Sequence, residues 1–144
     1  MSDAPDLKVF AIFADLSEDE RELVADMLTR MELDPGDQLF AEGAESEGLV
    51  LVERGSVALN SGRAGALGLL MAGDSIGAAS LVAVGTREAT AIASEPACVL
   101  ILSRESYRRL AEDAPRAACR MLEVALADLA SAVREGLDRY TTET

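Results

Sequence analysis

The stretch PGDQLFAEGAESEGLVLVERGSVAL, residues 35–59, is the most informative part of the sequence for the fold. Turn signals that contain glycine interrupt it every few residues, and short runs rich in valine and leucine lie between them. Two further runs of this kind, residues 89–94 and 98–102, follow after more turn signals. Many short strands with regularly spaced glycine turns are typical of a β-sandwich or barrel, so residues 33–102 are predicted to form an antiparallel β-roll.

The alternating apolar positions of these strands are expected to form the core, because alternate side chains of a strand point to the same face. They are Leu39, Phe40, Leu49, Leu51, Val57, Leu59, Val99 and Ile101. Cys98 alternates with Leu100 and Leu102 in the last run and is interpreted as a small core residue.

A helical pattern precedes the β-roll, within residues 8–31. Ser17 followed by Glu20 forms a capping box, which predicts a helix that begins near Ser17. Apolar residues at helical spacing are expected to share one face of this helix. They are Leu23, Val24, Met27, Leu28 and Met31.

Two more helices are predicted after the β-roll. Ser103 can cap a short helix through Leu110, and Pro115 suits the first position of a long helix, where the missing N–H of proline has no cost. The chain is therefore expected to be one domain of the mainly β, α+β class, residues 1–144. Its C-terminal helices are expected within residues 104–140.

Composition and charge exclude several function classes. The chain has 26 acidic and 13 basic residues, a net charge of −13, and such a surface repels nucleic acid and anionic membranes. With no histidine, it cannot hold a Ser-His-Asp or Cys-His nucleophile system or a histidine-ligated metal. Two cysteines are too few for a disulfide framework, and the N-terminus lacks a secretory pattern. We therefore expect a cytoplasmic, non-enzymatic protein with no cofactor and no metal.

Three motifs resemble the cyclic nucleotide-binding domain family, which includes the sensory half of catabolite-activator-type transcription factors and the regulatory domains of cyclic-nucleotide-dependent kinases and channels. LSEDERELVADM (16–27) resembles the family's leading helix, and residues 34–59 resemble its opening strands. AGDSIGAASLVAVGTREATAIA (72–93) resembles its phosphate-binding cassette. The resemblance implies a jelly-roll β-roll, a regulatory role in signal transduction and a bacterial source.

The family's cassette reads Gly-Glu-x-x-Leu, then a short stretch, then an arginine and small residues. Gly77 and Leu81 match its first part, and Arg87 stands at the position of the phosphate arginine. An arginine offers a fork of donors, and the start of a short helix offers backbone N–H groups, so both suit a cyclic phosphate. The residues implied at the site are Gly77, Ala78, Ala79, Arg87, Glu88 and Ala89.

Two of these residues depart from the family pattern. Ala78 replaces the glutamate that accepts the ribose hydroxyl, and Glu88 replaces a small residue beside the phosphate. We therefore expect cyclic AMP and cyclic GMP binding to be weak or lost. In one alternative Arg87 pairs with Glu88 or another local acid in a vestigial pocket. In the other, Arg87 still binds a cyclic nucleotide or another small anion.

The long C-terminal helix carries a heptad pattern. Its apolar positions alternate at spacings of three and four, which predicts an a/d seam. The seam comprises Cys119, Leu122, Leu126, Leu129, Val133, Gly136 and Tyr140. The family commonly dimerises through this helix, so the resemblance implies a homodimer, whereas in the alternative the stripe packs on the molecule's own β-roll.

Two function classes remain open from the sequence. The first is a sensory or regulatory module whose long helix signals to a protein partner. The second is a ligand-free dimerisation or scaffold module that uses the same fold. No basic recognition helix follows the long helix, so neither a DNA-binding domain nor a nucleic-acid or membrane partner is expected.

Overall fold

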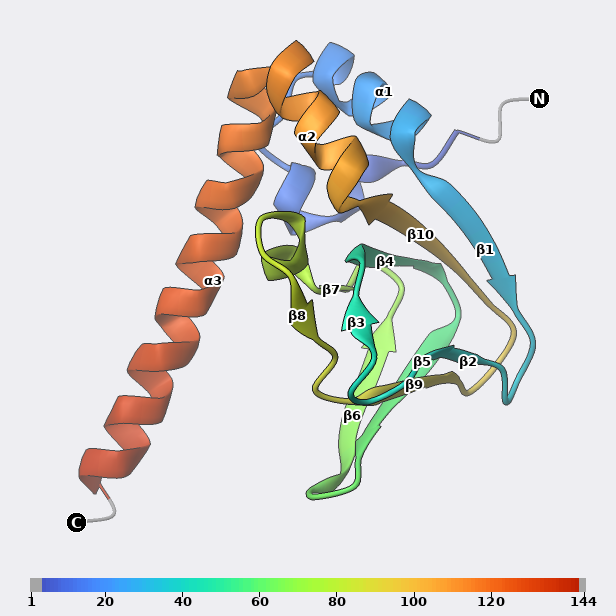
Figure 1. The fold of residues 1–144 in the computed structure, drawn as a ribbon, viewed down its shortest axis with the longest axis vertical. Coiled ribbons are helices and arrows are strands. Elements are labelled where there is room, and N and C mark those ends of the chain that lie inside the picture. Colours follow the sequence, from blue (N-terminus) through green and yellow to red (C-terminus); the bar gives the residue numbers. More distant parts are fainter. Residues whose placement is uncertain (1–3, 143–144) are drawn as a thin grey trace.

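The computed structural model describes the backbone of residues 4–142 and the side chains of residues 4–139. In the sequence, a β-roll follows short N-terminal helices and precedes two C-terminal helices, and in space the helices from both ends of the chain lie together at one end of the roll (Figure 1). The helices are the 3₁₀-helices η1 (Leu7–Val9), η2 (Ala11–Phe13) and η3 (Ala78–Leu81) and the α-helices α1 (Glu18–Met27), α2 (Arg104–Asp113) and α3 (Pro115–Thr142). The strands are β1 (Thr29–Leu33), β2 (Gln38–Phe40), β3 (Glu45–Ser46), β4 (Gly48–Arg54), β5 (Ser56–Ser61), β6 (Gly65–Met71), β7 (Ser75–Ile76), β8 (Gly85–Thr86), β9 (Thr90–Ala93) and β10 (Ala97–Ser103).

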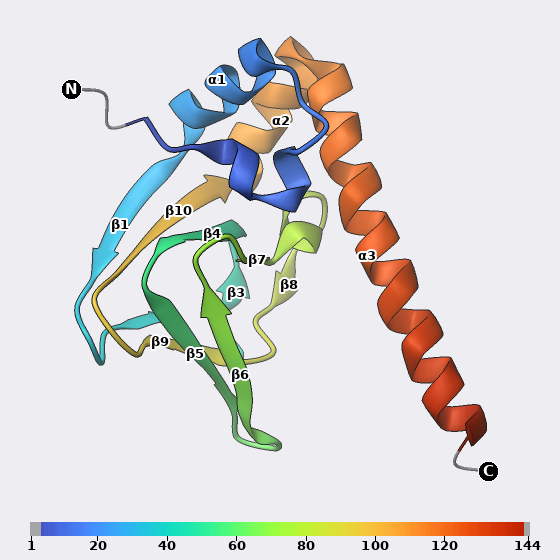
Figure 2. The same cartoon turned by 180° about the vertical axis from the view of Figure 1, so that it is seen from behind.

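The described strands form three antiparallel sheets. One has the order β1-β10-β4-β7, the second has the order β2-β9-β5-β6, and β3 pairs with β8 in a third. Seen from behind, β5 and β6 form a long hairpin that extends from the body of the roll (Figure 2). The predicted antiparallel β-roll with flanking helices is confirmed.

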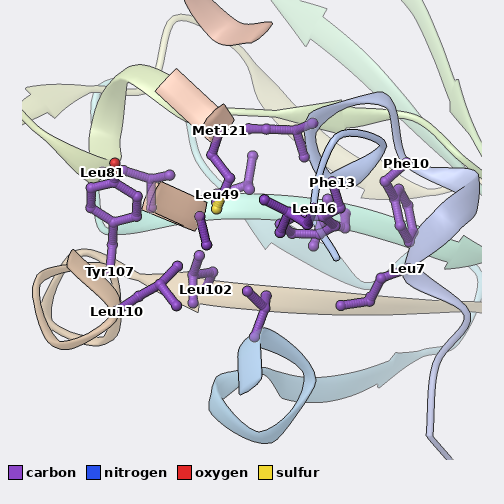
Figure 3. Packing of buried hydrophobic residues seen from close by; sticks show 14 of the residues in the cluster. Leu7, Phe10, Phe13, Leu16, Leu49, Leu81, Leu102, Tyr107, Leu110 and Met121 are labelled. Atoms are coloured by element: carbon purple, nitrogen blue, oxygen red, sulfur yellow. The ribbon is translucent and has the colours of Figure 1, made fainter. Parts of the chain in front are cut away.

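The sheet of β1, β10, β4 and β7 has a hydrophobic cluster on each side. On the helical side, Leu49, Leu51, Leu100 and Leu102 pack with apolar residues of η1, η2, η3, α2 and α3 (Figure 3). On the inner side, Val50, Val52 and Val99 pack with residues of the second sheet. Each fully buried Val or Leu side chain stabilises the fold by about 1.5–3 kcal/mol, so both clusters hold the sheet in place.

The eight alternating apolar residues that were predicted for the core all lie in these two clusters or pack against the inner one. Leu49, Leu51, Val57 and Val99 are buried, and Cys98 is buried as well. Leu39, Phe40, Leu59 and Ile101 are half-buried and pack against the inner cluster. The expectation of one core face per strand is wrong for β4 and β10, because this sheet is covered on both sides and buries consecutive residues.

Helix α1 begins as predicted but ends earlier. The Ser17 side chain accepts a hydrogen bond from Glu20 N at 3.2 Å, and the Glu20 carboxylate accepts one from Ser17 N at 2.8 Å, which completes the capping box. The helix ends at Met27, and Met31 lies in β1 opposite Val99 rather than on a helical face. Pairing with β10 overrides the helical spacing, since it provides ladder hydrogen bonds along the whole of residues 29–33.

The two C-terminal helices are confirmed at their predicted starts. Ser103 caps α2, its side chain accepting from Ser106 N at 3.1 Å, and the helix runs three residues beyond Leu110. Helix α3 begins at Pro115, and the hydroxyl of Tyr107 donates to Ala118 O at 2.7 Å, which ties α2 to α3. Within residues 4–142, no helix combines the length and the apolar character needed to cross a lipid bilayer.

Candidate ligand-binding site

Gly77 sets the local backbone of the cassette. It follows β7 with a φ of 91°, in the left-handed region that favours glycine, and its carbonyl accepts from Ser80 N at 2.9 Å to begin η3. A Cβ on Gly77 would lie 2.5 Å from Arg87 Nη1 and 2.8 Å from Gly48 O. The arginine side chain therefore packs directly against the glycine backbone, a contact that any larger residue would prevent.

Arg87 is half-buried and held by three different contacts. Its backbone N donates to Ala44 O at 2.8 Å, Nη2 donates to Gly48 O at 3.1 Å, and Cζ lies 4.2 Å from the centroid of the Phe40 ring. Burial lowers the pKa of the Arg87 guanidinium below its ordinary value, and the negative charge of Glu47 opposes this shift. The guanidinium nevertheless stays charged, so it is a fixed cation on the ring of an aromatic residue.

Arg87 lines a cavity of about 280 Å³ inside the roll. Five apolar side chains from four strands form most of its wall, and two glutamates complete the lining. The lining residues are Met31, Leu39, Phe40, Ala44, Glu45, Glu47, Gly48, Val50, Arg87 and Ile101. One cation, two carboxylates and an apolar wall can hold a small molecule through ionic and apolar contacts together.

Ala78 and Ala79 line a different hollow. With Val82 they form one side of an apolar groove of about 370 Å³, whose other side is helix α3. The residues that α3 contributes are Leu122, Ala125, Leu126 and Leu129. The structure thus brings Gly77 and Arg87 together, whereas the two alanines of the cassette face the long helix.

The last two predicted site residues differ in exposure. Glu88 is exposed, whereas Ala89 is buried at 6% exposure. No ion pair joins Arg87 to Glu88 among the side chains of residues 4–139, and the guanidinium instead contacts Gly48 O and the Phe40 ring. The structure of the described residues therefore does not have the Arg87–Glu88 ion pair that the sequence left open as an alternative.

Arg104 is a positioning residue that the sequence did not single out. As the first residue of α2, it donates from Nε to Ser80 O at 2.8 Å and from Nη2 to Ser46 O at 2.7 Å. Ser46 and Ser80 are both buried and their hydroxyls are hydrogen-bonded to each other. A basic residue is unfavourable at a helix N-terminus, because the helix dipole is positive there. An arginine directly after the serine cap was therefore a sign that this side chain makes contacts outside its own helix.

The predicted seam residues all fall within α3. Leu122 is half-buried against the helical cluster, but Leu126, Leu129 and Val133 are 66%, 60% and 53% exposed. The alternative that the whole stripe packs on the molecule's own β-roll is therefore wrong beyond Leu122. The side chain of Tyr140 lies outside the described residues.

Residues 30–114 match the model of a family described as the cyclic nucleotide-binding domain. The cAMP-dependent protein kinase regulatory subunit of Yarrowia lipolytica is 32% identical over 105 residues, which make up 72% of this chain and 28% of that protein. This chain thus spans less than a third of the length of that relative. Because the relative is fungal, the bacterial source expected from the sequence stays a prediction.

Two solved structures share the fold along most of the chain. The catabolite activator protein of Thermus thermophilus has a TM-score of 0.78 at 29% identity and covers 90% of this chain and 62% of its own. A cyclic nucleotide-binding domain from Methylobacillus flagellatus has a TM-score of 0.77 at 26% identity and covers 96% of this chain and 82% of its own.

Proposed function

The chain belongs to the cyclic nucleotide-binding domain family, and we propose that it is a non-catalytic regulatory module in which the Arg87 cavity senses a ligand and α3 carries the response. Cyclic AMP and cyclic GMP bind weakly or not at all in this proposal. The protein works as a homodimer that signals to a protein partner through its long helix.

The observation that carries the proposal is the set of charges around Arg87. The guanidinium is fixed beside Gly77 and Gly48 O, as an anion site requires, yet Glu45 and Glu47 line the same cavity. Two carboxylates repel the phosphate that one arginine attracts. At position 78 an alanine methyl accepts no hydrogen bond from a ribose hydroxyl, and the loss of a charged acceptor costs about 1.5–3 kcal/mol, roughly ten- to a hundredfold in affinity.

The position of α3 supports its part in the proposal. The groove between the cassette and α3 has Ala78, Ala79 and Val82 on one side and the first seam residues on the other. Any shift of the cassette therefore changes the packing of α3. The exposed seam residues Leu126, Leu129 and Val133 offer the apolar stripe that a second helix can cover.

Titration calorimetry of the whole chain with cyclic AMP and cyclic GMP tests the proposal. We expect no binding, or binding no tighter than the high micromolar range, and we expect Arg87→Gln to remove any heat that remains. The exposed Arg108, in the middle of α2, offers a matched control as Arg108→Gln. A submicromolar dissociation constant for either nucleotide would overturn the proposal, because Arg87 and the backbone would then be sufficient for recognition.

A further inference from the structure

The Arg87 guanidinium has donors to spare. Within residues 4–139 its side chain makes one hydrogen bond, from Nη2 to Gly48 O, and its flat face lies on the Phe40 ring. An arginine carries five N–H donors, so most of them remain for water or for a bound anion. The protein thus holds the guanidinium in one orientation and leaves most of its N–H donors without a protein acceptor among the described residues.

Glu45 and Glu47 stand apart from this cation. The charge of Glu47 acts on Arg87 through space, but neither glutamate lies within the 4.0 Å of an ion pair with it among the described residues. Both glutamates are exposed and line the cavity, so they flank the side that is open to water. A ligand placed between the opposite charges can therefore contact both kinds of group at once.

The rest of the cavity is apolar and small. Met31, Leu39, Phe40, Val50 and Ile101 form its wall. Its volume of about 280 Å³ is just below the range of about 300–1,000 Å³ that is usual for ligand pockets. This size favours a compact molecule with an aliphatic or aromatic body.

We infer that the Arg87 cavity takes a small zwitterionic ligand of the class of apolar α-amino acids. Its carboxylate binds Arg87, its ammonium group binds Glu47 and Glu45, and its side chain packs on the apolar wall. The inference rests on the proposed function, since it names the ligand class of the same site. A cyclic nucleotide has a phosphate for Arg87 but no cation for the two glutamates, whereas a zwitterion satisfies both.

Three compounds with the same branched carbon chain test the contributions of the carboxylate and the ammonium group separately. L-leucine carries both charges, isocaproate lacks the ammonium group, and isoamylamine lacks the carboxylate. Each is titrated into the nitrogen-labelled full chain and followed by NMR, which also reports weak binding and its location. We expect leucine to shift the amide signals of Ala44, Gly48 and Arg87, and each single-charge analogue to bind roughly ten- to a hundredfold more weakly.

Two variants and one control complete the experiment. In Glu47→Gln the preference moves toward isocaproate, and in Arg87→Gln it moves toward isoamylamine. Glu112→Gln removes the same charge from an exposed position on α2 and leaves all three affinities unchanged. The comparison of the three compounds on the wild type does not depend on the variants, so the inference can be tested even if a variant does not fold.

Three results would count against the inference. Isocaproate that binds the wild type as tightly as leucine would show that the glutamates take no part, and no signal change at saturating leucine would overturn the zwitterionic class. Either result leaves the proposed function standing if cyclic AMP also binds weakly. Submicromolar cyclic AMP binding would overturn the proposed function and this inference together.

Discussion

A single missing Cβ shapes the ligand site. Gly77 allows Arg87 Nη1 and Gly48 O to approach its backbone, and its left-handed φ is strained for other residues. Gly43 has a similar φ of 85° but nothing within 4 Å of a Cβ position. The two glycines therefore separate the cost of backbone strain from the cost of displacing Arg87 and Gly48 O.

We expect Gly43→Ala to lower the free energy of unfolding by about 1–2 kcal/mol and Gly77→Ala by at least about 1 kcal/mol more. Urea denaturation of the two variants and the wild type measures both values. Equal losses in the two variants would mean that Arg87 moves aside freely and that its position does not depend on Gly77.

The sequence predicted part of the site at the level of residues. Gly77 and Arg87 were identified because they match a local motif in which one needs a special backbone and the other carries charge. Phe40, Glu45 and Glu47 were not assigned to the site, because their approach to Arg87 depends on strand pairing between distant parts of the chain. Phe40 is placed by the pairing of β2 with β9, and the two glutamates are placed by the pairing of β3 with β8. Arg104 reaches the cassette by a similar long-range contact.

At the scale of elements, local signals predicted starts better than ends. The N-caps Ser17 and Ser103 and the first-position proline Pro115 placed three helix starts correctly, because each of these signals acts within one turn. The switch from α1 to β1 was missed, since residues 29–33 form a strand only through β10. Strand β6 was not predicted, because its glycines weaken the strand signal and its side chains are mostly exposed.

Helix α3 offers the sharpest test among the elements. Leu126→Asp and Leu129→Asp are each expected to weaken a homodimer by roughly a hundredfold or more, because the dimer would bury an unpaired charge. Ser131→Asp adds the same charge to an exposed position off the seam and is the matched control. Sedimentation analysis measures all four proteins.

A wild type that stays monomeric at high micromolar concentration would contradict the dimer. The same conclusion would follow if Ser131→Asp weakened association as much as the two seam variants did, because the effect would then come from net charge alone.

Over the whole molecule, the net charge of −13 opposes association. Each copy brings the same excess of carboxylates to an apolar seam, so the repulsion acts at long range while the attraction acts on contact. The Debye length falls from about 10 Å at 0.1 M salt to about 3 Å at 1 M, which screens the repulsion.

We therefore expect the dissociation constant of the homodimer to fall several-fold when sodium chloride rises from about 50 mM to about 500 mM. Light scattering over a concentration series at each salt level measures it. A constant that rises with salt would instead indicate ion pairs across the interface, and the seam would not be its main contact.

Strand β4 separates two packed interiors, with five consecutive buried residues from Gly48 to Val52. A change of size at any of these positions must be accommodated on both sides at once, which single mutations rarely achieve. Glu45 and Glu47 stand outside that constraint, because both are exposed and line the cavity. Evolution can therefore change the ligand of such a domain by substituting a few residues around the opening of the cavity, while the buried residues of β4 stay the same.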